Sequence, residues 1–319
     1  MDYILLIIGF FILIKWADFL VEGSSSIAKN FGISPLVIWL TVVAFGTSAP
    51  EFFVSILSAV RGQTDLALGN IIGSNIANVL LILWVASFIY PIKAKASTIY
   101  KEVPFSLIAS IALFFMAYDT YFAGATTNII SRSDGLILML FFIIFFSYTF
   151  GISKNTSQED EEEIPTLSNG KTFVYLMLGI TWLSLWAYFL VNSAQVIAAQ
   201  FWVPESFIGL TVIAFGTSLP ELATAVMASM KKQVDIVVWN VVGSNIFNIL
   251  LVLSTTAVVS DIPVQGTIIT DIIIELFVIT LLIVFLFFIG KRGVLTRIEW
   301  GIFLSLYLIY VVYLFINLS

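Results

Sequence analysis

Two glutamates, Glu51 and Glu221, stand out because each follows a proline inside a long apolar segment. Residues 44–51 read Ala-Phe-Gly-Thr-Ser-Ala-Pro-Glu, and residues 214–221 read Ala-Phe-Gly-Thr-Ser-Leu-Pro-Glu. A carboxylate at the centre of a membrane helix costs a few kcal/mol or more, so it usually faces a cavity and marks an ion or proton path. A buried structural pair is the alternative, but two acids near one axis would repel each other or share a proton.

A second polar phrase follows each glutamate at the same distance. Residues 73–78 read Gly-Ser-Asn-Ile-Ala-Asn, and residues 243–248 read Gly-Ser-Asn-Ile-Phe-Asn. Both phrases recur after 170 residues, so the chain contains a long internal repeat. Such a phrase alone would indicate helix packing in lipid, but its fixed distance from a Pro-Glu pair favours a site. Two pairs four positions apart share a helix face: Ser74 with Asn78, and Ser244 with Asn248.

The polar groups of these phrases are hard oxygen donors. Thr47 lies one helical turn before Glu51 on the same face, with Ser48 next to it. Thr217 and Ser218 repeat this arrangement. The proline before each glutamate has no N–H, so the carbonyl of the glycine four residues earlier is left free. Such oxygens suit Ca²⁺, Na⁺ or Mg²⁺ rather than softer metals.

The charge of the two glutamates indicates which ions fit. One Ca²⁺ neutralises two carboxylates, and two or three Na⁺ do so by competing for the same oxygens. An empty, fully ionised pair is costly to bury, which disfavours crossing the membrane unloaded. Because the chain has no Cys and no His, thiolate sites, imidazole ligands and most general-base catalysis are excluded.

The remaining sequence predicts helices that hold these phrases in a bilayer. Of the 319 residues, 60% are hydrophobic and 11% are charged, whereas a soluble domain carries about 25% charged residues. Only helices or a closed barrel satisfy the backbone in lipid, and apolar runs of about 20 residues favour helices. The pattern predicts ten spans, at residues 3–28, 35–60, 66–90, 103–122, 134–152, 172–198, 205–230, 235–259, 266–289 and 298–317.

The basic residues predict the orientation of these spans. If the loops alternate sides, only Arg61 and Arg132 fall on one side of the membrane. The other side then collects Lys29, Lys93, Lys95, Lys101, Lys154, Lys171, Lys231, Lys232, Lys291, Arg292 and Arg297. By the positive-inside rule, the second side is cytoplasmic and both termini are extracytoplasmic. The expected location is the cell membrane.

Five spans separate equivalent residues of the repeat. Because five is odd, the second half must enter the membrane in the opposite direction from the first. We therefore expect an all-α integral membrane protein of ten transmembrane helices in two inverted five-helix repeats, with a midplane site between them. The expected units are residues 1–152, a cytoplasmic acidic linker at residues 153–171, and residues 172–319. The linker contains six acidic or amide residues in a row and is interpreted as a solvated, flexible connection.

Other polar residues in apolar segments receive separate interpretations. Lys15 and Asp18 are three apart and are expected to form a buried intrahelical pair. Asp271 and Glu275 are expected to be acids at the extracytoplasmic rim. Asn75 and its repeat mate could serve as structural hydrogen-bonding residues or as ligands.

The two linked motifs resemble the α-repeats of the sodium/calcium exchanger family, within the calcium/cation antiporter superfamily. The resemblance rests on residues 46–51 with 73–78, and on the second copy at 216–221 with 243–248. It implies ten helices in two inverted halves, in which spans one and six slide against a core, and exchange of several Na⁺ for one Ca²⁺. The ligands it implies are Glu51, Glu221, Thr47, Thr217, Ser48, Ser218, Ser74, Ser244, Asn78 and Asn248, with backbone oxygens of Ala44 and Ala214.

One departure from the family pattern concerns Asn248. Some similar members carry Asp at this position, so the site here has two acids rather than three. Neutralisation of Ca²⁺ is unaffected, but stoichiometry and proton coupling are left open. The large regulatory domains found between the halves of animal relatives cannot fit in the short linker.

The resulting hypothesis is a secondary antiporter that exchanges Na⁺ for Ca²⁺ by alternating access. A Ca²⁺/H⁺ antiporter is the nearest alternative, and a cation channel with broken helices is an alternative of another class. An intramembrane hydrolase lacks a nucleophile–base set, so no enzymatic activity is expected. The expected partners are Ca²⁺, Na⁺ or H⁺ and the lipid bilayer, with no cofactor, nucleic acid or obligate protein partner.

Overall fold

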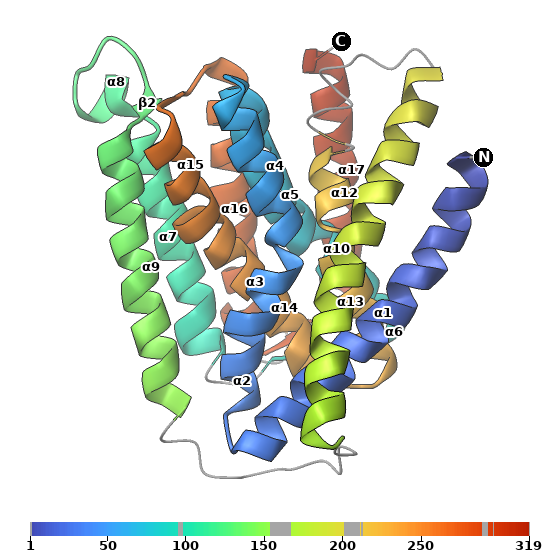
Figure 1. The fold of residues 1–319 in the computed structure, drawn as a ribbon. Coiled ribbons are helices and arrows are strands. Elements are labelled where there is room, and N and C mark those ends of the chain that lie inside the picture. Colours follow the sequence, from blue (N-terminus) through green and yellow to red (C-terminus); the bar gives the residue numbers. More distant parts are fainter. Residues whose placement is uncertain are drawn as a thin grey trace.

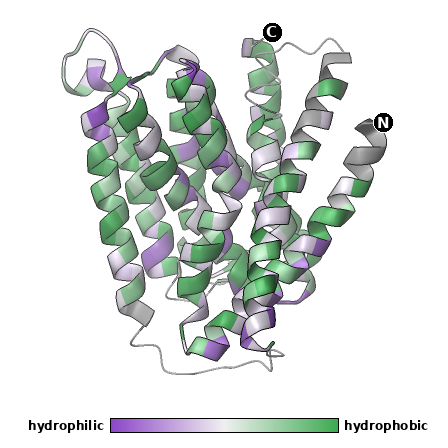
Figure 2. Cartoon of the chain, viewed as in Figure 1, coloured by the Kyte–Doolittle hydropathy of each residue, from purple (hydrophilic) through white to green (hydrophobic). Residues whose placement is uncertain are grey.

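The computed structural model describes residues 2–94, 98–153, 167–200, 211, 213–288, 293–295 and 297–318. Most of these residues lie in helices that run side by side as one bundle (Figure 1). Hydrophobic residues dominate the helices along most of their length (Figure 2). A helix satisfies its backbone groups internally, which is what a lipid environment requires.

The first half of the chain contains nine α-helices and three π-helical segments, labelled η, among the described residues. They are α1 (Asp2–Phe31), α2 (Pro35–Ile38), η1 (Trp39–Val43), α3 (Ala44–Thr47), α4 (Ala49–Val60), α5 (Thr64–Ala77), η2 (Asn78–Ile82), α6 (Leu83–Ile89), η3 (Thr98–Glu102), α7 (Val103–Met116), α8 (Asp119–Phe122) and α9 (Arg132–Ser153), with strands β1 (Ile92–Lys93) and β2 (Ile129–Ile130).

The second half repeats much of this order. Its described elements are α10 (Asn169–Gln200), α12 (Ala214–Thr217), α13 (Leu219–Met230), α14 (Val234–Phe247), η5 (Asn248–Leu253), α15 (Ser254–Val259), α16 (Gly266–Phe288) and α17 (Arg297–Leu318), with strands β3 (Ile262–Pro263) and β4 (Val294–Leu295).

Seven helices within the described ranges are long and apolar enough to cross a membrane, and the bent pair Pro35–Thr47 with Ala49–Val60 is an eighth candidate. The seven are Thr64–Ile89, Thr98–Met116, Arg132–Gly151, Asn169–Phe189, Val234–Val259, Gly266–Phe288 and Glu299–Asn317. The prediction of a helical membrane protein is confirmed. Residues 205–210 and 212 of the predicted seventh span lie outside the described residues, as do residues 154–166 of the predicted linker.

Two helical hairpins form the centre of the bundle. Helix α4 packs on α5, and α13 packs on α14. The hairpins also cross between halves, because α12 contacts α5 while α3 and η1 contact α14. Most residues of α5 and α14 are buried, so these two helices form the interior against which the others pack.

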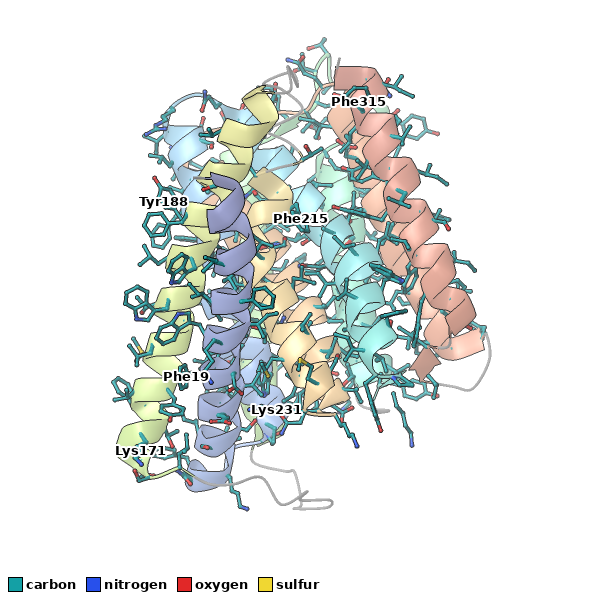
Figure 3. The ribbon with its side chains drawn as sticks, turned by 90° about the vertical axis from the view of Figure 1, so that its right-hand side faces the viewer. Phe19, Lys171, Tyr188, Phe215, Lys231 and Phe315 are labelled. Carbon is teal, nitrogen blue, oxygen red and sulfur yellow. The ribbon has the colours of Figure 1, made fainter. Side chains whose placement is uncertain are left out.

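Helices α1 and α10 lie side by side along one flank of the bundle (Figures 1 and 3). Their backbones approach closely at two glycines. A Cβ at Gly179 would come within 2.9 Å of the Leu20 Cα atom, and one at Gly23 would lie 2.7 Å from the Leu176 nitrogen. Small residues permit such packing in membranes, where van der Waals contact replaces the hydrophobic effect between helices.

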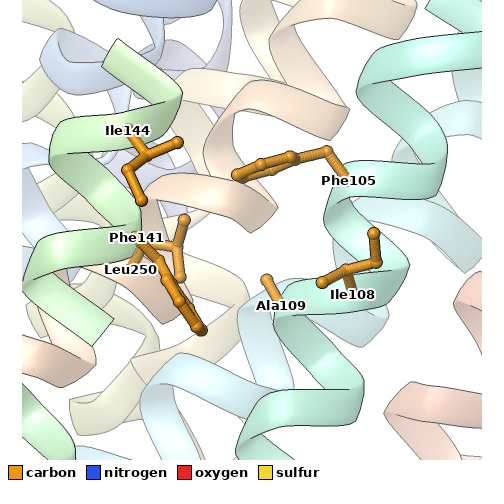
Figure 4. A pocket seen from close by; sticks show the side chains of 6 residues that line it. All are labelled: Phe105, Ile108, Ala109, Phe141, Ile144 and Leu250. Carbon is orange, nitrogen blue, oxygen red and sulfur yellow. The ribbon is translucent and has the colours of Figure 1, made fainter. Parts of the chain in front are cut away.

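The sequence analysis did not predict the short strand ladders between the halves or the apolar pocket. Antiparallel two-residue ladders join β1 to β4 and β2 to β3, each linking a connection of one half to the other half. An apolar pocket of about 220 Å³ lies between α7 and α9 and is lined only by hydrocarbon (Figure 4). With no oxygen on its walls it cannot ligate a cation.

The prediction that Lys15 and Asp18 form a buried pair is wrong in part. The two charged groups lie 3.9 Å apart, but the Lys15 side chain is 69% exposed. The closer partner of Asp18 is Lys231, at 2.5 Å, and Lys231 also bonds Glu22 at 2.9 Å. Helix periodicity could not reveal this contact, because Lys231 follows the end of α13, a helix of the other half.

Candidate cation site

A break in the helix positions each predicted glutamate. Ser48 leaves helical geometry, with φ −81° and ψ 7°, and the flanking segments bend by 46°. Ser218 has nearly the same geometry, with φ −81° and ψ 4°. Each break comes just before a proline in the first turn of the next helix, where a missing N–H costs no hydrogen bond. The predicted interruption beside each glutamate is therefore present in both copies.

The two glutamates are buried and each is bonded by a serine of the other half. Both side chains are 0% exposed. Ser48 Oγ donates to Glu221 Oε1 at 3.1 Å, and Ser218 Oγ donates to Glu51 Oε1 at 3.3 Å. The structure thus brings together two acids that lie 170 residues apart in the chain.

Several buried oxygens around these acids have no hydrogen-bond partner within the described residues. They are Glu51 Oε2, Glu221 Oε2, Asn78 Oδ1 and Asn248 Oδ1. More than about 90% of buried polar groups are hydrogen-bonded in proteins, so each exception requires an explanation. All four are acceptors of the kind that Ca²⁺ and Na⁺ ligate.

The predicted hydroxyls and carbonyls lie in the same network. Ser74 Oγ is 3.1 Å from the Ala214 carbonyl and 3.3 Å from Thr217 Oγ1. On the other side, Thr47 Oγ1 is 3.3 Å from the Ala44 carbonyl.

Ser244, the last of the predicted serines, belongs to the same group of oxygens as Thr47. Ser244 Oγ lies 3.4 Å from Thr47 Oγ1 and donates to Glu221 Oε1 at 3.1 Å. The pairs Ser74–Thr217 and Ser244–Thr47 each join a Gly-Ser-Asn helix to the broken helix of the opposite half.

Two residues of this network were missed from the sequence. Asn70 accepts a hydrogen bond from Thr217 at 3.0 Å, and Asn240 accepts one from Thr47 at 3.4 Å. Their amide nitrogens approach the carbonyls of Glu51 and Glu221, at 3.5 and 3.4 Å. A signal was available, because these asparagines occupy equivalent positions of the repeat, one helical turn before each predicted serine.

The remaining asparagines form amide pairs between halves. Asn78 Nδ2 donates to Asn245 Oδ1 at 2.9 Å, and Asn248 Nδ2 donates to Asn75 Oδ1 at 3.1 Å. These bonds favour the hydrogen-bonding interpretation of Asn75 and Asn245. The π-helical segments η2 and η5 begin at Asn78 and Asn248, and such bulges are frequent at functional sites.

The donor set defines what could bind. No cluster of three or more Asp, Glu, His or Cys side chains suited to a metal occurs in the described part of the chain. A cation at the centre would therefore use two carboxylates and several neutral oxygens. Ca²⁺ takes six to eight such ligands in flexible geometry, and the hydroxyl, amide and carbonyl oxygens described above meet this need.

The expectation that Asp271 and Glu275 lie at the rim is wrong. Both are buried, and Glu275 accepts a hydrogen bond from Ser110 at 2.8 Å. Helix α16 packs against α7 and α5, so its acidic face turns into the bundle. The burial of Glu275 could not be predicted from the sequence, because its partner Ser110 lies on a helix of the other half.

Comparison with known proteins gives consistent results over nearly the whole chain. Residues 1–151 and 171–316 match the family described as sodium/calcium exchanger protein. Inner membrane protein YrbG of Escherichia coli strain K12 is 36% identical over 266 residues, covering 80% of this chain and 79% of YrbG. Sodium/calcium exchanger MaX1 of Methanosarcina acetivorans is 29% identical over 285 residues, covering 79% of this chain and 81% of MaX1.

A solved structure supports the same relationship. The sodium-calcium exchanger NCX_Mj, soaked with Na⁺ and Sr²⁺, superimposes with a TM-score of 0.81 and 29% sequence identity. The alignment covers 98% of this chain and 97% of that one.

Proposed function

This chain belongs to the sodium/calcium exchanger family, and we propose that it exports Ca²⁺ in exchange for inward Na⁺ by alternating access. The observation that carries the proposal is the reciprocal arrangement of two buried glutamates. Each accepts a hydrogen bond from a serine of the opposite half and keeps one carboxylate oxygen that has no partner in the described part of the chain. Such an arrangement presents two negative charges to one point between the halves.

The proposed ligands surround this point. Glu51 and Glu221 neutralise one Ca²⁺, and the neutral oxygens complete its coordination. Na⁺ is similar in size to Ca²⁺ and competes for the same oxygens, so the two ions exclude each other. The neutral ligands are Thr47, Thr217, Ser48, Ser218, Ser74, Ser244, Asn78 and Asn248, with the carbonyls of Ala44 and Ala214. Mutual exclusion at one site is the physical basis of exchange.

The proposed architecture is ten spans in two inverted repeats, residues 1–152 and 172–319, joined by a cytoplasmic linker. The near-identical breaks at Ser48 and Ser218 and the paired contacts between halves support it. Lys171 and Lys231 lie toward one end of the bundle and Phe315 toward the other (Figure 3). Both chain ends lie toward the end opposite these lysines (Figure 1), in keeping with extracytoplasmic termini in the cell membrane.

Alternating access would arise from movement of α1 and α10 as a pair. The two helices pack closely on each other through glycines, whereas α10 meets the core at Gly46 through the Ile180 side chain. A sliding pair would expose the glutamates to one side of the membrane at a time.

The test is Ca²⁺ uptake by proteoliposomes loaded with Na⁺. Glu51→Gln keeps the size of the side chain and removes one of the two charges, so we expect Na⁺-driven Ca²⁺ flux to fall about a hundredfold or more. Glu221→Gln should behave alike, and an unchanged size-exclusion profile would show that the variants fold. Ca²⁺ flux retained in Glu51→Gln would refute the proposal.

Ca²⁺/H⁺ exchange is the second candidate, because the charged ligands are carboxylates and each can take up a proton. A Na⁺ gradient and a pH gradient, applied separately to the same vesicles, distinguish the two coupling ions. Ca²⁺ flux with neither counter-ion would instead indicate a channel.

A further inference from the structure

The hydroxyl of Thr217, one of the proposed cation ligands, has more than one acceptor for its single hydrogen. Thr217 Oγ1 lies 3.0 Å from Asn70 Oδ1, on α5, and 3.2 Å from the carbonyl of Ala214, on its own helix. Ser74 Oγ is 3.3 Å away. Asn70 and Thr217 are both buried. Because a hydroxyl carries only one hydrogen, the group that accepts it determines which oxygens stay open to a cation.

The orientation of the Asn70 amide decides between these acceptors. With Oδ1 toward Thr217, the amide accepts the hydroxyl hydrogen and spares the Ala214 carbonyl a further donor. If the amide were turned round, its NH₂ group would donate to Thr217 Oγ1, and the hydroxyl hydrogen would pass to the Ala214 carbonyl. Each of the two proposed ligands would then lose a lone pair to a hydrogen bond.

Two backbone carbonyls fix the orientation of this amide. Asn70 Nδ2 donates to Ser55 Oγ at 3.0 Å and approaches the Glu51 carbonyl at 3.5 Å. Ser55 Oγ in turn donates to the Ala67 carbonyl at 3.4 Å, so its oxygen accepts from Asn70. Because a backbone carbonyl can only accept, the NH₂ end of Asn70 must face Ser55 and Glu51. The oxygen end of Asn70 is therefore the end that faces Thr217.

The second half of the chain lacks the step made by Ser55. The repeat position equivalent to Ser55 is Ala225, which has no hydroxyl. Asn240 Nδ2 lies 3.4 Å from the Glu221 carbonyl, and Asn240 Oδ1 accepts from Thr47 at 3.4 Å. The Thr47 hydroxyl lies as close to a backbone carbonyl, at 3.3 Å. The hydrogen of Thr47 is thus held less firmly by its asparagine than the hydrogen of Thr217.

We propose that Ser55 and Asn70 are positioning residues, which turn the hydrogen of the Thr217 hydroxyl away from the cation site. The inference rests on the proposed function and deepens it, because it concerns how one ligand is oriented. With its hydrogen held by Asn70, Thr217 offers a lone pair to Ca²⁺ or Na⁺ without first breaking a bond to its own helix. Such preorganisation lowers the cost of binding.

The first test is Ser55→Ala in proteoliposomes. The Ca²⁺ concentration for half-maximal exchange should rise about two- to tenfold, because the Asn70 amide loses the acceptor that orients it. Ser106→Ala is the matched control, since Ser106 is equally buried and its hydroxyl has no partner among the described residues. Loss of the Ser106 hydroxyl should leave that concentration unchanged. An unchanged size-exclusion profile would show that both variants fold.

A double-mutant cycle separates positioning from a structural role. Thr217→Val and Thr47→Val each remove one hydroxyl, at equivalent positions of the repeat. If Ser55 acts through Thr217, Ser55→Ala should have no further effect in the Thr217→Val background and its full effect in the Thr47→Val background. A structural role for Ser55 predicts the same rise in both backgrounds.

Ca²⁺ binding to the purified protein, measured by calorimetry, gives the same comparison for a variant that transports too slowly. The expected result is a shift that requires the Thr217 hydroxyl and does not require that of Thr47. An equal shift in the two backgrounds, or no shift from Ser55→Ala alone, overturns the inference. Absence of both Ca²⁺ binding and Ca²⁺ exchange in the unmodified protein would instead refute the proposed function, and this inference with it.

Discussion

Ser48 and Ser218 connect the two halves at the scale of single residues. Each lies at a helix break and donates to the glutamate of the opposite half. Because a hydroxyl both donates and accepts, each serine can release the carboxylate and offer its own oxygen to a cation. In the proposed cycle these serines stabilise the glutamates when no cation is bound and act as ligands when one is.

Ser48→Ala is expected to raise the half-saturating Ca²⁺ concentration about tenfold, since it removes one ligand and one charge-assisted hydrogen bond. Ser218→Ala should have a similar effect because its contacts are equivalent. The control is Ser87→Ala: Ser87 is equally buried, but its hydroxyl bonds the carbonyls of Leu83 and Trp84 in its own helix. The measurement is Ca²⁺ uptake as a function of concentration. Equal responses of the Ser48 and Ser87 variants would contradict the assigned role.

At the scale of elements, the helix break decides where each glutamate points. Helix α4 begins anew after Ser48, and the 46° bend turns it away from the axis of α2 to α3. Pro50 lies in the first turn of α4 and cannot donate to the preceding turn. The break and the buried position of Glu51 therefore have a common cause in the sequence.

Pro50→Ala should restore a donor at this position and allow the helix to continue across Ser48. We expect a straighter helix, a displaced Glu51 and a fall of about tenfold or more in Na⁺-driven Ca²⁺ exchange. Pro35→Ala is the matched control, because Pro35 occupies the first position of α2, where an N–H has no helical partner. The measurement is the rate of Na⁺-driven Ca²⁺ exchange by both variants. An unimpaired Pro50→Ala variant would show that the helix break does not depend on proline.

At the scale of the whole molecule, α1 and α10 form a pair that is joined to the core by an ion-pair cluster at Lys231. Lys231, just after α13, bonds Asp18 and Glu22 of α1. Because these charged groups are partly exposed, their attraction is worth about 0.2–1 kcal/mol. If the pair slides during exchange, these ion pairs must break.

Lys231→Gln should then raise the maximal exchange rate, by at most about fivefold, because it removes a contact that opposes sliding. Lys232→Gln carries the same charge change and is the control, since the Lys232 amine lies over the Tyr90 ring, 5.9 Å from its centroid. Initial rates at low and high ionic strength provide the measurement, and the difference between native protein and variant should shrink with salt. A slower Lys231 variant would indicate that the ion pairs assist the movement.

The sequence by itself determined the membrane setting, the helices and the oxygens of the candidate site. Apolar length sets the spans, and the repeated Pro-Glu and Gly-Ser-Asn phrases place each polar group on a helix face through local geometry. Asn70 and Asn240 also occupy equivalent positions of the repeat, so a complete comparison of the two copies would have identified them as candidates.

Only the tertiary structure decided which helix faces pack against each other. The bonds from Ser48 to Glu221, from Ser110 to Glu275 and from Lys231 to Glu22 each join residues more than 160 positions apart. Periodicity fixes the direction of a side chain relative to its own helix, but the partner depends on how separate helices pack. For the same reason Glu275 looked like a rim residue in the sequence and lies within the bundle in the structure.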